Sequence, residues 1–461
     1  MHQIKLQNKI LLAEDGELLS HVLQKYGISV PHPCGGTGKC GKCMLVVDGK
    51  KQRSCQYPVR HNISLVLPND MPIESQSDAK QTEMLTEEMC YVLDIGTTTL
   101  ALALVSLDKK KVVHVVTQNN PQRAFGADVM SRIAYCQTHP QRILHTTLTD
   151  TVEHMVASFG ISQKLKMFVA GNVTMLHLFF DMDCRGIGTA PYTPLFLDGK
   201  KTESFIDGVS QIESLPAIHS FIGADIVAGI YHVGMPSQKK YNLLLDLGTN
   251  AEIVLFSNEK ILCTSAAAGP CFEGANIVCG TGAITGAICE AGFDNGKLTY
   301  QTIGNASPIG ICGTGLVDII ATLLSRGIID RTGFLEDENY PITDTVYLDA
   351  SDIRQFQLAK SAICSAVLSL LRIENISFSD VQTLYLAGGF STKINIPNAA
   401  AVGLFPRELA PKSLSVGNSS LLGTIKYALE KDILPPYTTA QYIDLAATEE
   451  FSRLFMENMM F

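Results

Sequence analysis

The sequence predicts two folded units of different size: a small α+β unit at the N-terminus and a large α/β unit over the rest of the 461 residues. Three observations support this division. Four of the 13 cysteines lie within the 22 residues 34–55. Residues 1–68 carry a formal charge of +5, whereas the remaining residues carry −14. A strand–turn–strand pattern with Asp-x-Gly-Thr occurs twice in the acidic part, at Asp94 and Asp246.

Composition excludes several classes of protein. Charged residues make up 18% and hydrophobic residues 46% of the chain, which argues against disorder. A net charge of −9 argues against a general nucleic-acid binder, because the phosphate backbone requires excess Lys and Arg. The chain shows no apolar run of about 18–20 residues and no leader sequence, so we expect a cytoplasmic protein without a membrane span. Its cysteines are then expected to be metal ligands or buried thiols.

The N-terminal cysteines have the spacing of a metal-binding loop. The run CGGTGKCGKC contains Cys34, Cys40 and Cys43, and its glycines allow the backbone to wrap closely around a ligand. After Cys43 the segment MLVV is predicted to be a strand, and Asp48-Gly49 predicts a two-residue hairpin turn. That hairpin would bring Cys55 back toward Cys43 and complete a set of four thiolates.

Four cysteines suit either a structural zinc ion or an iron–sulfur cluster. Zinc ribbons use two separated Cys-x2-Cys knuckles, whereas three cysteines in one glycine-rich loop and a fourth farther along is the spacing of a [2Fe–2S] cluster. The cluster is therefore favoured over zinc. This part of the chain resembles plant- and adrenodoxin-type ferredoxins, apart from its short interval before Cys55. The resemblance implies a β-grasp fold over residues 1–68.

Residues 69–89 are polar and lack a sustained apolar period, so we expect a linker there. As a flexible coil, about twenty residues span on the order of 25 Å.

The large unit contains a repeat with a clear chemical use. The segments YVLDIGTTTLALALVSL and NLLLDLGTNAEIVLF place Asp94 and Asp246 152 residues apart, each in a tight turn between apolar strands. Glycine in such a turn allows a phosphate to approach, and threonine and backbone N–H groups donate hydrogen bonds to it. The aspartate is suited to hold Mg²⁺, usually through water. Two such turns predict two related halves that bind a nucleotide.

Further glycine-rich segments follow the repeat: FVAGNVTM from residue 168, GICGTGLVDIIATLL from 310, LYLAGGF from 384 and GNSSLLGTIKYAL from 417. Singly, each is more typical of close helix packing than of ligand contact. Their order resembles that of the sugar kinase, chaperone and actin superfamily of ATPases. The resemblance implies a two-lobed, actin-like domain over 90–461, with lobes of about 90–240 plus 420–461 and 241–419. It also implies ATP and Mg²⁺ contacts at Asp94, Gly96, Thr97, Thr98, Asp246, Gly248, Thr249, Asn250, Gly388 and Gly389.

A ferredoxin-like domain on such an ATPase, with the segments NNPQRAFGADVMSRI and IGADIVAG, is similar to the reductive activators of corrinoid proteins. The resemblance implies that a [2Fe–2S] cluster delivers one electron to a Co(II) corrinoid protein and that ATP hydrolysis accompanies the regeneration of Co(I). It implies reduced ferredoxin or a flavoprotein as electron donor, and a homodimer. Asp246, Asp128 and Asp225 are the candidate catalytic carboxylates. For Asp128 and Asp225, helix N-capping is an equally weighted alternative.

Two other functions stay open at this point. A small-molecule kinase could use the same nucleotide-binding fold, although it leaves the cysteine cluster unexplained. A redox sensor could use the cluster to gate ATP-dependent binding of a partner, and it predicts negligible electron delivery. A nicotinamide- or flavin-linked reductase is disfavoured because no Gly-x-Gly-x-x-Gly motif follows a strand.

Overall fold

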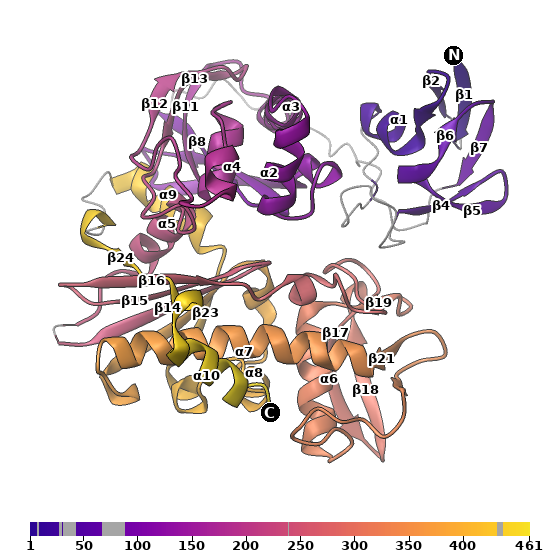
Figure 1. The fold of residues 1–461 in the computed structure, drawn as a ribbon. Helices are drawn as coiled ribbons and strands as arrows, with labels where there is room; N and C mark the ends of the chain where they lie inside the picture. The colour runs from indigo at the N-terminus through magenta and orange to yellow at the C-terminus, as the bar shows by residue number, and fades with distance from the viewer. Residues whose placement is uncertain (7–8, 27–29, 31–42, 67–87, 238, 431–436) are drawn as a thin grey trace. The chain divides into compact units, whose positions relative to one another are not determined.

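The computed structural model describes residues 1–6, 9–26, 30, 43–66, 88–237, 239–430 and 437–461 (Figure 1). The chain separates into two compact units, Met1–Ser214 and Leu215–Phe461. The first unit contains the N-terminal domain and the first Asp-x-Gly-Thr turn, and the second contains the other turn. Residues 215–240 and 420–461, which were predicted to belong to the first lobe, lie in the second unit.

In its described residues, the N-terminal domain has a five-stranded sheet with the order β2-β1-β7-β4-β5, a two-stranded sheet β3-β6 and the helix α1. Leu19, Val22 and Leu23 of α1 are fully buried in the core of this domain. The elements are β1 (His2–Leu6), β2 (Lys9–Ala13), β3 (Glu17–Leu18), α1 (Leu19–Lys25), β4 (Met44–Val47), β5 (Lys50–Arg53), η1 (Ser54–Gln56), β6 (Pro58–Val59) and β7 (Ile63–Val66).

The predicted hairpin is confirmed. Strands β4 and β5 pair in antiparallel fashion around Asp48 and Gly49, whose φ angles are 48° and 77°. Positive φ at both positions is what a two-residue type I′ turn requires. After β5, the Ser54 N–H donates to the Cys43 carbonyl at 3.0 Å, so the chain returns to the cysteine that precedes the hairpin.

The rest of the first unit is a six-stranded sheet with the order β10-β9-β8-β11-β13-β12. Every residue of its strand β8 is buried, as expected for a strand in the interior of a covered sheet. The elements are β8 (Met89–Ile95), β9 (Thr99–Ser106), β10 (Lys111–Asn119), η2 (Pro121–Ala124), α2 (Val129–Thr138), α3 (Arg142–Ala157), β11 (Leu165–Gly171), α4 (Val173–Phe179), η3 (Arg185–Gly188), β12 (Lys201–Glu203) and β13 (Val209–Ser214).

The second unit is built on a six-stranded sheet with the order β23-β22-β14-β15-β16-β24 and a three-stranded sheet, β18-β17-β19. The elements that form or contact the site are α5 (Ala224–Val233), β14 (Tyr241–Leu247), β15 (Ala251–Phe256), β16 (Ile261–Ala266), η4 (Pro270–Glu273), β17 (Ala287–Asp294), β18 (Lys297–Thr302), β19 (Gly310–Ile311), α6 (Gly313–Ser325), α7 (Ala350–Ile373), β22 (Val381–Ala387), η7 (Gly389–Lys393), β23 (Ser413–Gly417), α9 (Ser419–Glu430) and β24 (Gln441–Tyr442). The remaining elements are η5 (Ile303–Asn305), β20 (Asn339–Pro341), β21 (Tyr347–Asp349), η6 (Phe378–Asp380), α8 (Ile396–Ala401), η8 (Arg407–Lys412), η9 (Tyr437–Thr439), η10 (Leu445–Ala447) and α10 (Glu449–Glu457).

The predicted internal repeat is confirmed by the topology of the two large sheets. In the first, β8, β9 and β10 form an antiparallel meander, and β11 and β13 follow in parallel beside β8. In the second, β14, β15 and β16 form the same meander, and β22 and β23 follow beside β14. Each Asp-x-Gly-Thr turn therefore joins the first two strands of its sheet.

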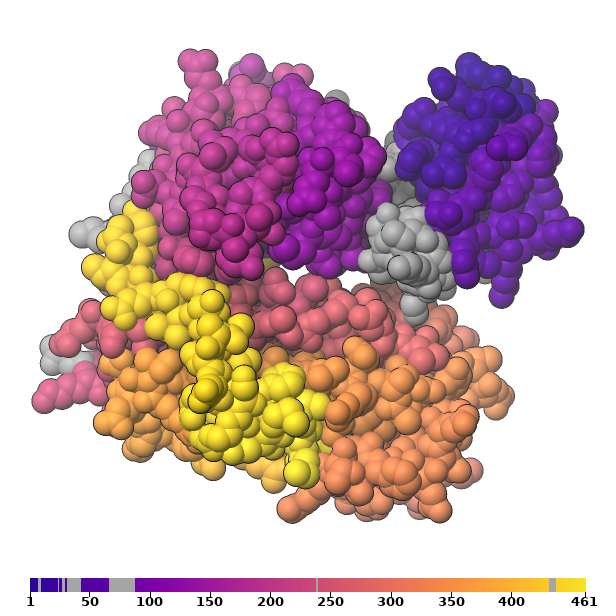
Figure 2. Space-filling model, in the orientation of Figure 1, coloured from indigo at the N-terminus to yellow at the C-terminus, as the bar shows by residue number. Residues whose placement is uncertain are grey.

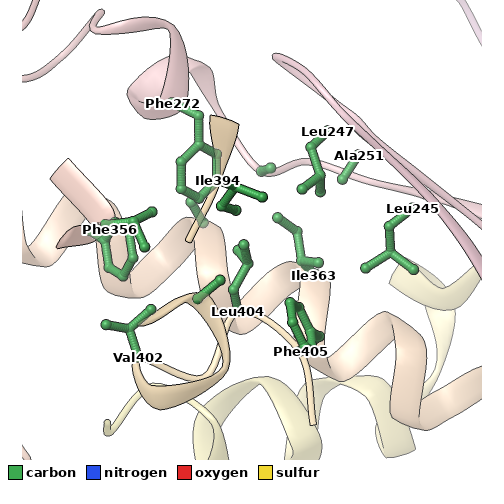
Figure 3. Close-up of a cluster of buried hydrophobic side chains, with 14 of the residues drawn as sticks. Leu245, Leu247, Ala251, Phe272, Phe356, Ile363, Ile394, Val402, Leu404 and Phe405 are labelled. Atoms are coloured by element: carbon green, nitrogen blue, oxygen red, sulfur yellow. The ribbon is translucent and has the colours of Figure 1, made fainter. Parts of the chain in front are cut away.

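Both faces of the second sheet are covered. Leu243, Leu245 and Leu247 of β14 face a core that includes α7 and Phe272 (Figure 3). Leu244 on the opposite face packs with Ile226 of α5. Helix α7 is long and apolar enough to cross a membrane, but 78% of its most apolar 18-residue window is buried inside the protein, which is typical of a core helix. The C-terminal helix α10 packs on α7 and forms part of the surface in Figure 2.

Helices α5 and α9 approach each other closely through small residues. A Cβ atom added to Gly423 of α9 would lie 1.9 Å from the Ala228 carbonyl oxygen of α5. A Cβ atom added to Gly229 would lie 2.9 Å from Ser419 Oγ. The small residues of the segment from 417 are thus explained by backbone contact between two helices of the second unit.

Candidate functional site

The first phosphate-loop candidate lies where β8 ends. Asp94 is the penultimate residue of β8 and is buried, and the Gly96 N–H donates to the Thr99 carbonyl at 3.0 Å. A Cβ atom on Gly96 would lie 2.6 Å from that carbonyl oxygen, so only glycine fits here. The turn is therefore tight enough to present its backbone to a ligand, as its sequence predicts.

Buried side chains hold the carbonyl groups of this loop. Asn120 Nδ2 donates to the Gly96 carbonyl at 2.8 Å, and the Asn120 N–H donates to the Thr98 carbonyl at 2.9 Å. The guanidinium group of Arg132, which is fully buried, donates to the Thr97 carbonyl. These bonds occupy the carbonyl oxygens of residues 96–98, which would repel a phosphate, and they fix the shape of the loop.

The segment NNPQRAFGADVMSRI supplies this support. The Gln122 N–H donates to Asn120 Oδ1 at 3.0 Å, and Arg132 Nη1 donates to Gln122 Oε1 at 3.2 Å. Arg132 Nε also donates to the Gly126 carbonyl at 3.0 Å. The sequence singled out this segment by resemblance only, and its contacts with the phosphate loop could not be read from the sequence.

Asp128 and Asp225 occupy different positions in their helices. Asp128 is the N-cap of α2, where its Oδ1 accepts from the Ser131 N–H at 2.7 Å in a complete capping box. Asp225 lies inside the first turn of α5, whose N-cap is Gly223. The capping alternative thus describes Asp128 and does not describe Asp225. A catalytic role for either residue stays a prediction.

The second phosphate-loop candidate ends β14. Its Gly248 N–H donates to the Asn250 carbonyl at 3.0 Å, and Asn250 is exposed. The Thr249 hydroxyl donates to Glu273 Oε2 at 2.7 Å. Glu273 belongs to η4, 24 residues farther along the chain, and the sequence analysis did not identify it.

The carboxyl group of Glu252 lies near those of Asp246 and Asp225. Glu252 of β15 is the cross-strand neighbour of Asp246 in the register of the β14–β15 pair. Burial, together with Asp225 and Asp246 nearby, raises the pKa of Glu252 well above its ordinary value, although a hydrogen bond with Ser265 opposes this shift. Glu252 was not predicted from the sequence. Counting residues back across the hairpin from Asp246 could have found it, because directly paired residues share one face of a sheet.

The glycine pair at the end of β22 approaches the second phosphate loop. Gly388 has φ of 91°, and a Cβ atom there would lie 2.8 Å from Asp246 Oδ1 and 2.6 Å from the Leu247 carbonyl oxygen. A Cβ atom on Gly389 would meet no atom within 4 Å. The structure therefore brings Gly388 to Asp246, while Gly389 borders open space suited to a ligand.

The η4 turn connects three of the glycine-rich segments. Besides the bond from Thr249 to Glu273, its Phe272 ring stacks on Phe390 of the glycine-pair loop, with centroids 4.8 Å apart. A Cβ atom on Gly313, at the start of α6, would lie 2.1 Å from the Phe272 carbonyl oxygen. The turn is thus fixed between the phosphate loop, the glycine-pair loop and α6.

Two of the four predicted cluster ligands lie in the described residues. Cys43 and Cys55 are both buried, and their Sγ atoms are 3.2 Å apart. Two thiolates on one metal ion, each about 2.3 Å from it, lie at most about 4.6 Å apart, so this pair is close enough to share one metal ion, iron or zinc. Cys34 and Cys40 lie outside the described residues.

In the described ranges, no three or more His, Cys, Asp or Glu side chains form a group that could hold a metal ion. Mg²⁺ at a nucleotide needs only one or two protein carboxylates, because phosphates and waters complete its shell, and Asp246 with its acidic neighbours provides oxygen ligands of that kind. Burial raises the pKa of the Cys263 and Cys271 thiols to about 12, which is typical of inert core cysteines.

Comparison with known proteins agrees with this arrangement. Residues 4–62 match the 2Fe-2S iron-sulfur cluster binding domain, residues 89–238 the RACo middle region, and residues 240–461 the C-terminal domain of RACo, described as the ASKHA domain. The chain is 32% identical over 415 residues to the corrinoid activation enzyme RamQ of Eubacterium limosum, covering 80% of this chain and 69% of that protein. It is 26% identical over 409 residues to the Co(II) methylated amine-specific corrinoid protein reductase of Methanosarcina barkeri, covering 79% and 75%.

A solved structure, a reductive activator for corrinoid, iron-sulfur protein, aligns with 100% of this chain and 98% of its own, with a TM-score of 0.72 and 24% identity. Together with the family matches, this similarity confirms the predicted fold class, a ferredoxin-like domain followed by an actin-like α/β domain.

Proposed function

Because the chain belongs to the RACo family of corrinoid activation enzymes, we propose that it is an ATP-dependent reductive activator. It transfers one electron from a reduced [2Fe–2S] cluster to a Co(II) corrinoid protein, which becomes Co(I) and can again accept a methyl group. The cluster loses one electron in this step and is reduced again by a donor. ATP hydrolysis accompanies the transfer.

One observation carries this proposal: a single chain combines a buried thiol pair suited to iron with two loops suited to phosphate. The Sγ atoms of Cys43 and Cys55 are 3.2 Å apart in the ferredoxin-like domain. The carbonyl oxygens of residues 96–98 accept hydrogen bonds from Asn120 and Arg132. These oxygens, which would repel a phosphate, are therefore occupied, and this supports a phosphate site at the loop. A kinase requires only the second feature.

The use of ATP follows from redox energetics. A plant-type [2Fe–2S] centre has a potential near about −400 mV, and for one electron each 59 mV uphill makes transfer about tenfold less favourable. An acceptor above that potential needs no ATP. An acceptor below that potential needs a nucleotide whose binding or hydrolysis favours the conformation in which the electron is transferred. The nucleotide can shift the population of that conformation only as far as its affinity differs between the transferring and the non-transferring conformation.

The residues of the site have separate roles in this proposal. Cys34, Cys40, Cys43 and Cys55 hold the cluster, and Asp94 and Asp246 bind Mg²⁺ through water. Gly96, Thr97, Thr98, Gly248, Thr249 and Asn250 contact phosphates or Mg²⁺, and Gly388 and Gly389 contact adenosine. In this proposal Asp225 and Asp128 reach the γ-phosphate or the attacking water, and Asp128 also caps α2.

The partners are part of the proposal as well. Reduced ferredoxin or a flavoprotein supplies the electron, and the +5 charge of residues 1–68 favours an acidic partner at that domain. The protein acts in the cytoplasm as a homodimer, without nucleic acid or membrane.

Two variants separate the electron-carrying part from the nucleotide part. Cys55→Ser should abolish the visible absorbance of the cluster and leave ATP affinity unchanged, because Cys55 packs in a core cluster formed by residues between Ile4 and Leu65, whereas the phosphate loops belong to other sheets. Asp246→Ala should keep the absorbance and lose most Mg²⁺-dependent ATP hydrolysis, since a charge beside the metal and phosphates is removed. Purified protein that holds one zinc ion and no iron or sulfide would contradict the proposal, and so would transfer of the γ-phosphate to a small metabolite.

A further inference from the structure

The threonines of the two phosphate-loop candidates have hydrogen bonds of opposite direction. Thr97 Oγ1 lies 3.0 Å from Asn172 Nδ2, whereas Thr249 Oγ1 lies 2.7 Å from Glu273 Oε2. A hydroxyl group has one proton to donate and two lone pairs that accept. If a neighbouring group accepts the proton, the hydroxyl can offer only its lone pairs to a ligand. If the neighbour donates to a lone pair, the proton is available to the ligand.

At Thr97 the neighbour is a donor. Asn172 Oδ1 accepts from the Met175 N–H at 2.9 Å as the N-cap of α4, and this bond fixes the orientation of the amide group. Nδ2 therefore faces Thr97, and an amide nitrogen can only donate. The proton of the Thr97 hydroxyl is consequently available for an acceptor such as a phosphate oxygen.

At Thr249 the neighbour is an acceptor. A carboxylate accepts hydrogen bonds and has no proton of its own to give, so the Thr249 hydroxyl donates to Glu273, at a distance usual for O–H···O. The hydroxyl proton of Thr249 is therefore engaged by Glu273, and the lone pairs of its oxygen point away from Glu273. An oxygen in that state repels phosphate oxygens and attracts a cation.

Glu273 is held firmly enough to impose this direction. It ends the η4 turn, where Gly274 has φ of 76° and a Cβ atom on it would lie 2.2 Å from the Thr281 carbonyl oxygen. Phe272, the preceding residue, is buried between Phe356 and Phe390, with centroid distances of 5.7 and 4.8 Å. The turn cannot move away from Thr249 without disturbing this aromatic contact.

Resting on the proposed function, we infer that Thr249, oriented by the positioning residue Glu273, offers its hydroxyl oxygen to Mg²⁺, whereas the Thr97 hydroxyl of the first loop keeps its proton for a phosphate oxygen. In P-loop NTPases a Ser or Thr hydroxyl oxygen also binds Mg²⁺, and Mg²⁺ prefers hard oxygen ligands. Here the adjacent acidic residues Asp246 and Glu252 lie on the same strand pair as this loop.

Binding measurements without turnover test the inference. ATP affinity is measured by calorimetry in EDTA and in Mg²⁺, and Mn²⁺ binding to the ATP complex is followed by the EPR signal of free Mn²⁺. Thr249→Val and Glu273→Ala should bind ATP as the unchanged protein does in EDTA and should weaken Mn²⁺ binding about 3- to 10-fold, the net value of one polar contact. Thr97→Val should weaken ATP binding by a similar factor with and without the metal.

Two further variants serve as controls. Thr249→Ser keeps the hydroxyl and should restore Mn²⁺ binding, and Glu259→Ala removes an exposed glutamate of the same unit and should change nothing. Equal loss of ATP affinity with and without metal in Thr249→Val would overturn the inference, because it would identify that hydroxyl as a phosphate donor. Unchanged Mn²⁺ binding in Thr249→Val and Glu273→Ala would also overturn it. If the unchanged protein binds no ATP, the proposed function fails together with the inference.

Discussion

Asn120→Asp is a nearly isosteric change beneath the first phosphate loop, and its effect can be worked out from the contacts. Asn120 is 1% exposed. Its Oδ1 accepts from the Gln122 N–H and its Nδ2 donates to the Gly96 carbonyl at 2.8 Å. Aspartate keeps the first bond but places a second oxygen against the Gly96 carbonyl, so two acceptors meet in a buried position.

The cost combines a lost hydrogen bond of about 1 kcal/mol with a buried unsatisfied carbonyl of about 1–3 kcal/mol. We expect the local free energy of opening of the loop to fall by about 2–4 kcal/mol, which corresponds to amide exchange roughly 30-fold faster or more. Hydrogen exchange measured by mass spectrometry on peptides covering residues 91–106 gives this quantity. ATP affinity should fall by about tenfold or more, because the loop no longer keeps its shape.

Asn119→Asp is the matched control, since it makes the same chemical change at the adjacent, exposed residue. Its Oδ1 contact with Arg123 at 3.4 Å can persist, and surface substitutions usually change stability by about 0.5 kcal/mol or less. If Asn120→Asp matches Asn119→Asp in exchange and in ATP affinity, then Asn120 does not support the loop and the account of this site is wrong.

Three other substitutions test separate parts of the structure. Glu252→Gln should raise the free energy of unfolding by about 1–3 kcal/mol at pH 8. Because the folded-state pKa of Glu252 is raised, this advantage should shrink as the pH falls and vanish below about pH 4.5. Thermal unfolding at several pH values that shows no such trend would contradict the prediction. Gly423→Ala should lower the melting temperature, because its Cβ atom would lie 1.9 Å from the Ala228 carbonyl oxygen. The cost of overpacking, about 1–3 kcal/mol, exceeds the gain in helix propensity of about 1 kcal/mol. An unchanged or higher melting temperature would show that α5 and α9 separate freely. Cys43→Ser should remove the visible absorbance and the iron content, and retention of both would exclude Cys43 as a ligand.

Features encoded locally were predicted from the sequence. Positive φ at Asp48 and Gly49 follows from turn chemistry, and the strands on either side of Asp94 and Asp246 follow from apolar runs interrupted by glycine. The repeated topology of the two large sheets follows from the recurrence of those segments at a fixed interval. The fold class itself was predicted from the resemblance of these segments and of the cysteine loop to known families.

Contacts made between distant segments could not be predicted. Nothing near Thr249 in the sequence indicates Glu273, and nothing near Gly96 indicates Asn120 or Arg132, because these partners meet only when the sheets and helices pack. Asp128 shows that a local pattern can also be ambiguous. A single aspartate before a helix suits both a cap and a catalytic group, and its position as N-cap of α2 was one of two equal expectations.

The most direct test of the central claim is the coupled reaction itself. The protein with its cluster loaded is mixed with a reductant and a Co(II) corrinoid protein, and Co(I) is followed by its visible absorbance with and without ATP and Mg²⁺. The account predicts Co(I) only when both ATP and Mg²⁺ are present, and none with Cys55→Ser or Asp246→Ala. Equal Co(I) formation without nucleotide would contradict an ATP-coupled activator, even if the protein binds and hydrolyses ATP.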